Sequence, residues 1–216
     1  MIIAIDGTAG SGKSTTAKKL AKQLNFFHID SGSLYRLVTY FCIIKKINPN
    51  QNELLTNILE DIQIEFDDNK ILLNGQDVSA EIRSHSVSNS VSEYSANIVV
   101  RNKLSDLQRD LAKYKDVVVE GRDIGTNVFP DSDFKFYLSA DVKVRADRRY
   151  SEMLKSGKKI DISKEQVLKN LIKRDQMDMN REHSPLIKSD DAVEIDTTDL
   201  SINEQVKLIM KTINKE

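Results

Sequence analysis

Cysteine is almost absent from this sequence, since Cys42 is the only one among 216 residues. A single cysteine excludes an intramolecular disulfide framework and a cysteine-rich zinc site, and it fits a reducing cytoplasm. Histidine is scarce as well, and the three positions His28, His85 and His183 form no pair with ligand-like spacing. We therefore expect no metal site built from histidines.

Long apolar runs and an excess of charge of one sign are also missing. No stretch approaches the roughly 18 apolar residues of a membrane-spanning helix. The first apolar run ends at Asp6 with no basic region before it, so we expect no secretory signal. Thirty-two Lys and Arg against 33 Asp and Glu give a formal net charge of −1, which argues against a broad nucleic-acid-binding surface. We expect a soluble cytoplasmic monomer with neither a membrane nor a nucleic acid as partner.

Glycine is scarce and clustered. Six of the eight glycines fall in three short stretches, namely Gly7, Gly10 and Gly12, then Gly32, then Gly121 and Gly125. Clustering of this kind is typical of a backbone that approaches a ligand closely.

Short apolar runs alternate with helical patterns along most of the chain. The predicted strands are Ile2–Ile5, Phe26–Ile29, Val117–Val119, Phe134–Leu138 and Val193–Ile195. The predicted helices are Ala17–Leu24, Leu34–Ile47, Ser79–Ala96, Val100–Tyr114, Val142–Lys155, Lys164–Arg181 and Ser201–Ile213. This alternation predicts a five-stranded parallel sheet between helices, a three-layer α/β/α fold.

One section breaks this alternation. Ile62–Phe66 alternates with period two, and turn residues separate it from Ile71–Leu73 and then from Gln76–Val78. The section predicts a small antiparallel three-stranded meander over about 62–79, inserted into one domain that spans 1–216.

The first glycine stretch matches a phosphate-binding motif. Gly7-Thr-Ala-Gly-Ser-Gly12-Lys13-Ser14 fits G-x-x-x-x-G-K-[ST] and lies between a predicted strand and a predicted helix. Backbone N–H groups of such a P-loop curl around phosphate, Lys13 can bridge the β- and γ-phosphates, and the Ser14 hydroxyl is a hard oxygen ligand for Mg²⁺. The predicted ATP-binding residues are Gly7, Thr8, Ala9, Gly10, Ser11, Gly12, Lys13, Ser14 and Thr15.

Two classes of P-loop protein remain open at this point. A nucleotide switch binds GTP and changes partners, whereas a kinase binds ATP and a small acceptor. The sequence has no Asn-Lys-x-Asp segment for guanine, which weakens the first class. Glycine also follows two further predicted strands, where ligands bind in such sheets, and this favours an acceptor pocket.

Three further segments carry a specific resemblance. Asp30-Ser-Gly-Ser-Leu-Tyr35-Arg36, Glu120-Gly-Arg-Asp-Ile-Gly-Thr-Asn-Val-Phe-Pro130 and Arg174-Asp-Gln-Met-Asp-Met-Asn-Arg181 resemble the signature segments of bacterial cytidylate kinases, which are nucleoside monophosphate kinases of the P-loop class. The resemblance spans the chain. It implies Mg²⁺-assisted transfer of the ATP γ-phosphoryl group to CMP or dCMP, a nucleoside-monophosphate-binding insert over about 33–100 and a lid over about 140–160.

The same resemblance assigns the acceptor site. It implies Ser31 near the ribose or base, Arg36 on the acceptor phosphate, and Ser92 and Arg101 on the cytosine. The CMP-binding residues that it implies are Ser31, Tyr35, Arg36, Ser92, Arg101, Asp123, Arg174, Asp178 and Arg181. Asp123 and Asp178 are expected at the sugar, and the arginines at phosphates, because guanidinium groups bind phosphate in a bidentate manner. Met179 departs from the pattern, since relatives often have an arginine there.

The catalytic residues implied are Lys13, Arg122, Asp123, Arg148, Arg174 and Arg181. Arg148 is preferred over Arg145 and Arg149 as the lid arginine that reaches the phosphates, and the alternative is a basic helix that faces water. Glu120 has two possible roles: it holds the Mg²⁺ shell through water, or it only orients its loop. The rival activities are a kinase that accepts UMP or another small acceptor, and a GTP-dependent switch.

Overall fold

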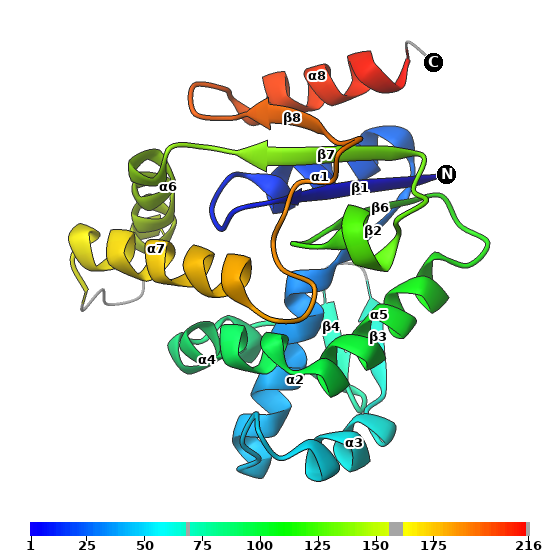
Figure 1. Ribbon diagram of the computed structural model, residues 1–216, viewed down its shortest axis with the longest axis vertical. Helices are drawn as coiled ribbons and strands as arrows, with labels where there is room; N and C mark the ends of the chain where they lie inside the picture. The colour runs from blue at the N-terminus through cyan, green and yellow to red at the C-terminus, as the bar shows by residue number, and fades with distance from the viewer. Residues whose placement is uncertain (68–69, 156–161, 215–216) are drawn as a thin grey trace. The chain divides into compact units, whose positions relative to one another are not determined.

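The computed structural model describes residues 1–67, 70–155 and 162–214 (Figure 1). The chain forms two compact units. The first unit contains Met1–Asp30 and Leu111–Glu216, and the second contains Ser31–Asp110.

A five-stranded parallel sheet forms the centre of the first unit, with the strand order β2-β6-β1-β7-β8. The sequence produces this sheet because its strands are short and apolar, and β6 is buried at every residue. The strands are β1 (Ile2–Gly7), β2 (Phe27–Asp30), β6 (Val117–Glu120), β7 (Phe134–Ser139) and β8 (Val193–Asp196). The predicted α/β fold with five parallel strands is confirmed.

Helices of the first unit place apolar side chains against this sheet. Leu20 of α1 and Ile209 of α8 share a buried cluster with Phe136 of β7. In Figure 1, α6 and α7 lie side by side, and these two helices contact each other. The helices are α1 (Lys13–Leu24), α6 (Val142–Lys155), α7 (Lys164–Asn180) and α8 (Ile202–Ile213), and a π-helical turn spans Ile124–Val128. A capping box begins α8, where the Ser201 hydroxyl accepts from the N–H of Glu204 and the Glu204 carboxylate accepts from the N–H of Ser201.

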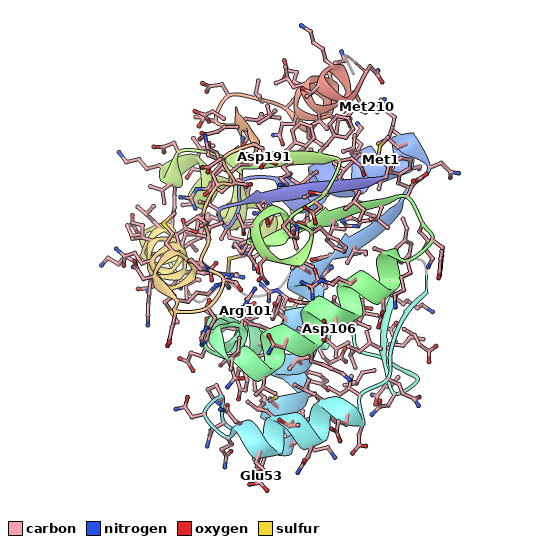
Figure 2. All side chains as sticks on the ribbon, turned by 45° about the vertical axis from the view of Figure 1, so that its right-hand side comes forward. Met1, Glu53, Arg101, Asp106, Asp191 and Met210 are labelled. Carbon is pink, nitrogen blue, oxygen red and sulfur yellow. The ribbon has the colours of Figure 1, made fainter. Side chains whose placement is uncertain are left out.

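The second unit combines helices with the predicted antiparallel meander. Strands β3, β4 and β5 form a three-stranded sheet, and Leu37 and Phe41 of α2 pack with Ile71 and Leu73 of β4. The elements are α2 (Ser31–Lys45), α3 (Asn52–Glu60), β3 (Ile64–Asp67), β4 (Lys70–Leu73), β5 (Gln76–Asp77), a 3-10 turn (Glu81–Arg83), α4 (His85–Ala96) and α5 (Ile98–Ala112). Figure 2 labels Arg101 and Asp106 along α5.

Two predicted helix starts in the second unit were wrong. The helix expected from Ser79 begins only at His85, because the Ser84 hydroxyl accepts the N–H of Val87 and caps a new helix there. The helix expected from Leu34 begins at Ser31, so the Ser-Gly-Ser stretch after β2 is its first turn and not a loop.

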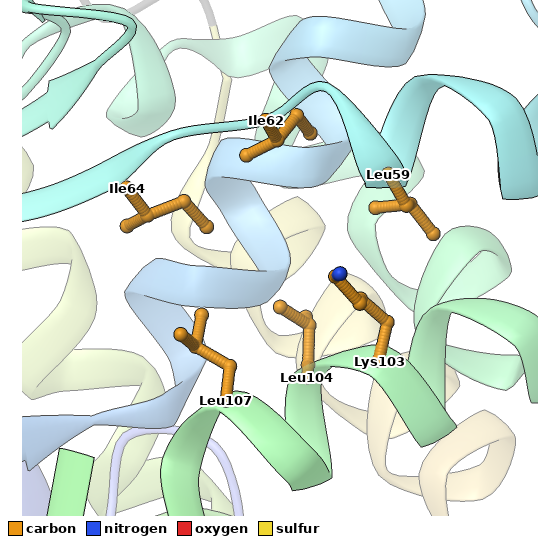
Figure 3. Close-up of a pocket in the computed structure, with 6 residues that line it drawn as sticks. All are labelled: Leu59, Ile62, Ile64, Lys103, Leu104 and Leu107. Atoms are coloured by element: carbon orange, nitrogen blue, oxygen red, sulfur yellow. The ribbon is translucent and has the colours of Figure 1, made fainter. Parts of the chain in front are cut away.

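A small pocket also lies within the second unit (Figure 3). Its lining is apolar except for one lysine, and it consists of Leu59, Ile62, Ile64, Lys103, Leu104 and Leu107. None of the predicted site residues lines this pocket.

Gly7, at the end of β1, provides a test of how tightly this strand packs. Its φ is +142°, and a Cβ there would lie 2.0 Å from the Leu138 carbonyl oxygen of β7. We expect Gly7→Ala to lower the free energy of unfolding by about 4 kcal/mol or more, because backbone atoms must move. The matched control is Gly75→Ala, where φ is +79° and nothing lies within 4 Å. It should cost only about 1–2 kcal/mol of backbone strain. Urea unfolding of both variants measures the difference, and equal losses would contradict this account.

Candidate active site

The phosphate loop connects β1 to α1. Gly10 and Gly12 have φ values of +78° and +94°, which a side chain would disfavour, and Gly12 occupies the N-cap position of α1 without a side chain to cap it. The first N–H groups of α1 and its positive dipole end therefore face the loop, as an anion site requires. Lys13 is buried, and its ammonium donates to the Thr8 carbonyl oxygen at 2.6 Å and to Ser11 Oγ at 3.4 Å.

The charge of Arg122 acts on two further cations beside this loop, Lys13 and Arg174. Burial, followed by the charge of Arg122, holds the pKa of Lys13 well below its usual range. Burial and the Arg122 charge likewise lower the pKa of Arg174 to about 10. Within the described residues, Arg174 Nε is buried with no hydrogen-bond partner. Burial lowers the pKa of Arg122 itself, but the pKa is raised overall, mainly by the charge of Asp178. Two buried cations whose pKa is lowered by a third form a site that an anion stabilises.

Two ion pairs connect the segment after β6 to the end of α7. Arg122 Nε donates to Asp178 Oδ2 at 2.9 Å, and Arg181 Nη2 donates to Asp123 Oδ1 at 3.2 Å. Burial raises the pKa of Asp178. The charges of Arg122 and Arg174, with the hydrogen bond from Arg122, together outweigh this effect, so the pKa lies below its usual value. The structure therefore brings these five predicted residues together, although their contacts with substrate stay predictions.

The helix predicted over Lys164–Arg181 needs one correction. α7 ends at Asn180, so Arg181 follows the helix instead of lying on it, and its Nε donates to the Ser184 carbonyl oxygen at 2.6 Å. Met179, where we noted a departure from the family pattern, is exposed.

Ser14 and Glu120 form the part of the site that suits a divalent cation. Ser14 Oγ donates to Glu120 Oε2 at 2.7 Å, and His28 Nε2 lies 3.3 Å from Glu120 Oε1. A hydroxyl and a carboxylate are hard oxygen ligands of the kind that Mg²⁺ prefers. No cluster of three or more acidic, histidine or cysteine side chains suited to a metal occurs among residues 1–67, 70–155 and 162–214. The donor set therefore fits a Mg²⁺ ion that also takes ligands from nucleotide phosphates.

Asp6 is a buried acid that sequence reasoning missed. Its carboxylate accepts the N–H of Ile124 at 2.9 Å and that of Gly125 at 2.8 Å, and so anchors the turn that follows Arg122 and Asp123. Burial raises its pKa from 3.8 to about 6. A signal was present, because Asp6 is the charged residue that ends an apolar strand directly before Gly7.

The raised pKa of Asp6 predicts a pH-dependent stability. A carboxyl whose pKa is higher in the folded state stabilises the fold when protonated, and this contribution is lost as the pH rises through about 6. We expect the free energy of unfolding of the unaltered protein, measured relative to that of Asp6→Asn, to rise by about 2 kcal/mol as the pH falls from about 7.5 to about 4.5. Urea unfolding of both proteins across this range measures it, and a difference that does not change with pH would contradict the prediction.

The three arginines of α6 are placed differently from one another. Arg148 Nη2 donates to the carbonyl oxygens of Thr197 at 2.6 Å and Thr198 at 3.2 Å. Arg145 is buried against the phosphate loop, while Arg149 pairs with the exposed Glu152. Residues 156–161 of the predicted lid lie outside the described residues. The preference for Arg148 as the phosphate-contacting lid arginine stays a prediction.

Thr197 is a second residue that sequence reasoning missed. It is buried, and its hydroxyl donates to the Ser11 carbonyl oxygen at 2.8 Å. The chain after β8 therefore supports the phosphate loop, and no motif marks this contact.

The remaining acceptor residues lie on three helices of the second unit. Ser31, Tyr35 and Arg36 belong to α2, Ser92 to α4 and Arg101 to α5. Arg36 Nη1 donates to Ser88 Oγ at 2.9 Å. The Arg101 guanidinium, 1% exposed, lies 5.4 Å from the centre of the Tyr35 ring and donates to the Ser95 carbonyl oxygen at 3.0 Å. The structure brings Tyr35 and Arg101 together, and a cytosine contact by either stays a prediction.

The phosphate loop between a parallel strand and a helix, with cations around it, defines a P-loop protein. A solved structure, shikimate kinase from Bacteroides thetaiotaomicron, shares this fold with a TM-score of 0.51 and 13% identity, over 99% of this chain and 98% of that one. No helix among the described residues has both the length and the apolar character to span a membrane.

The family model described as Cytidylate kinase matches residues 3–215. The cytidylate kinase of Clostridium tetani (strain Massachusetts / E88) is 48% identical over 220 residues, which cover 100% of this chain and 96% of the relative. The cytidylate kinase of Clostridioides difficile (strain 630) is 43% identical over 214 residues, which cover 99% and 98%. The chain belongs to the cytidylate kinase family and is therefore an enzyme, a phosphotransferase.

Proposed function

We propose that the protein transfers the γ-phosphoryl group of ATP to CMP and dCMP and so forms CDP or dCDP and ADP. An oxygen of the acceptor phosphate attacks the γ-phosphorus, and the bond from that phosphorus to the β–γ bridging oxygen breaks. Family membership over the whole chain supports the substrates. The observation that carries the reaction type is the cluster of Lys13, Arg122 and Arg174, because a buried site in which the Arg122 charge lowers the pKa of Lys13 and of Arg174 favours an anion.

On the donor side, loop N–H groups and the N-terminus of α1 bind the ATP phosphates. Lys13 exchanges its hydrogen bond to the Thr8 carbonyl oxygen for phosphate oxygens. Ser14 and Glu120 are the residues that would hold Mg²⁺, directly or through water. When bound with ATP, Mg²⁺ neutralises charge on the β- and γ-phosphates.

On the acceptor side, Asp123 and Asp178 orient the sugar of CMP, and Arg181 and Arg174 bind phosphate. The two ion pairs already hold Arg122 and Arg181 in fixed geometry, so little side-chain entropy is lost on binding. Ser31, Tyr35, Arg36, Ser92 and Arg101 bind the remaining parts of the nucleotide. A buried polar partner for the 4-amino group of cytosine discriminates against uracil, because uracil leaves that partner unpaired.

The reaction needs no histidine as a general base. Phosphoryl transfer passes through a loose transition state that depends mainly on positioning and on charge neutralisation. Lys13, Arg122 and Arg174 neutralise the charge that spreads over the migrating group. We further propose that the enzyme works in the cytoplasm as a monomer in pyrimidine nucleotide metabolism, and its single buried Cys42 and balanced charge support this.

The experiment that tests this proposal is an acceptor panel. ADP release is measured with ATP, Mg²⁺ and one acceptor at a time, namely CMP, dCMP, UMP, AMP or GMP. Strong acceleration by CMP and dCMP alone is expected. Equal use of UMP would point to the broader pyrimidine kinase, and GTP binding without acceptor-dependent turnover would point to a switch.

A further inference from the structure

The backbone of Ala9, in the phosphate loop, is bound by charged side chains at both its N–H and its carbonyl oxygen. The Ala9 N–H donates to Asp175 Oδ1 at 3.2 Å, and the Ala9 carbonyl oxygen accepts from Arg145 Nη1 at 3.0 Å. The same Nη1 also donates to Asp175 Oδ2 at 2.5 Å. Because Arg145 belongs to α6 and Asp175 to α7, two helices hold the backbone of one loop residue.

The three residues are enclosed. Ala9 is 5% exposed, Arg145 6% and Asp175 7%. A Cβ at Gly10 would lie 3.3 Å from Arg145 Cβ and 3.5 Å from the Arg145 carbonyl oxygen, so the loop rests directly on α6. A hydrogen-bonded ion pair in such a dry setting fixes geometry more firmly than an exposed pair does.

The negative charge of Asp175 is unexpected beside a loop that is proposed to bind phosphates. The Asp175 carboxylate is close enough to raise the pKa of both Arg122 and Arg174, so its field extends into the cation cluster. An unpaired carboxylate there would repel the triphosphate, and Arg145 neutralises it. The Ala9 N–H is also already bonded, although the motif alone predicts that it binds phosphate.

We propose that Arg145 and Asp175 are positioning residues that fix the phosphate loop in its ATP-binding form, with neither side chain touching the nucleotide. The inference rests on the proposed function, because it takes the loop as the ATP site. A loop that is ordered before binding loses less entropy when ATP arrives, so the pair raises ATP affinity. The acceptor, which is bound elsewhere, gains nothing from it.

Asp175→Ala gives a test in which two explanations have opposite signs. If the charge of Asp175 were its only influence, its removal would strengthen ATP binding. The positioning role predicts instead that the dissociation constant for MgATP rises about 10- to 100-fold, as expected for a lost charge-assisted hydrogen bond. Calorimetric titration without an acceptor measures this constant, and the KM for CMP at saturating ATP should stay within about twofold of the unaltered value.

A second variant tests whether a loss of MgATP affinity is caused merely by unfolding. Asp175→Ala leaves Arg145 buried without its partner, whereas Arg145→Ala/Asp175→Ala removes both charges and is expected to fold more readily. The double variant should show the same selective loss of MgATP affinity, with faster hydrogen exchange at the Ala9 amide. The matched control is Asp147→Asn, which removes an exposed ion pair with Lys164 that joins the same two helices, and it should change none of these values.

Each outcome is decisive for one of the two proposals. Unchanged or tighter MgATP binding in a folded variant would overturn the positioning role, as would an equal loss for ATP and CMP. If the unaltered protein itself failed to bind ATP or to phosphorylate CMP, the proposed function would fail instead.

Discussion

Lys13→Ala is expected to reduce kcat/KM by about 10³-fold or more with every acceptor, because one preorganised charge on a transferring phosphoryl group contributes an effect of that order. The loss should appear mainly in kcat, since the charge on the migrating group grows in the transition state. Steady-state kinetics with CMP and with dCMP measure the effect.

The structure also predicts that this loss is not caused by unfolding. Lys13 is a buried ammonium whose pKa is held down by burial and by Arg122, so it is costly to bury in the absence of ATP. Lys13→Ala should therefore melt within a few degrees of the unaltered protein. The control is Lys22→Ala, an exposed residue on the same helix α1, which should retain full activity. Normal turnover by Lys13→Ala with any acceptor would refute the assignment of the phosphate loop.

Asp178→Ala is the second change with a large expected effect. It should raise the KM for CMP and lower kcat, with ATP affinity changed by less than about threefold, because Asp178 is assigned to the acceptor sugar and to Arg122. It should also lower the free energy of unfolding by about 3–5 kcal/mol, since it leaves a largely buried guanidinium unpaired.

The conservative variant separates these two effects. Asp178→Asn retains an oxygen that can accept from Arg122 Nε at the same place, so it should recover part of the stability. It should recover less of the activity, because the neutral amide no longer balances Arg122 and Arg174. A collapse of ATP affinity with normal handling of CMP would contradict the assignment of this end of α7.

The sequence predicted those parts of the fold that depend on local pattern. The helix expected to start at Val142 starts there in the structure, because strand β7 ends shortly before it at Ser139 and apolar residues then recur with helical spacing. The phosphate loop was predictable for the same reason, since its function resides in eight consecutive residues. The start of α4 was not predictable from local pattern, because a single serine within a polar stretch, Ser84, decides where this helix begins.

The supports of the site could not be predicted in this way. Asp6 bonds to Gly125, Ala9 to Asp175 and Ser11 to Thr197, and these partners lie 119, 166 and 186 positions apart in the chain. Such pairs form only when the strand order of the sheet brings distant loops to one edge, and no periodicity encodes them. The grouping of Arg122, Asp123 and Asp178 was predictable only through the family resemblance, because the spacing of charges along α7 alone indicates an ordinary solvated helix.

The most direct test of the central claim follows the phosphoryl group itself. The protein is incubated with ATP labelled at the γ-phosphate, Mg²⁺ and CMP, and the labelled products are separated. The account predicts that the label passes to CDP, one for each ADP formed, and that almost none appears as free phosphate while CMP is present. Label released as inorganic phosphate, with CMP recovered unchanged, would contradict it.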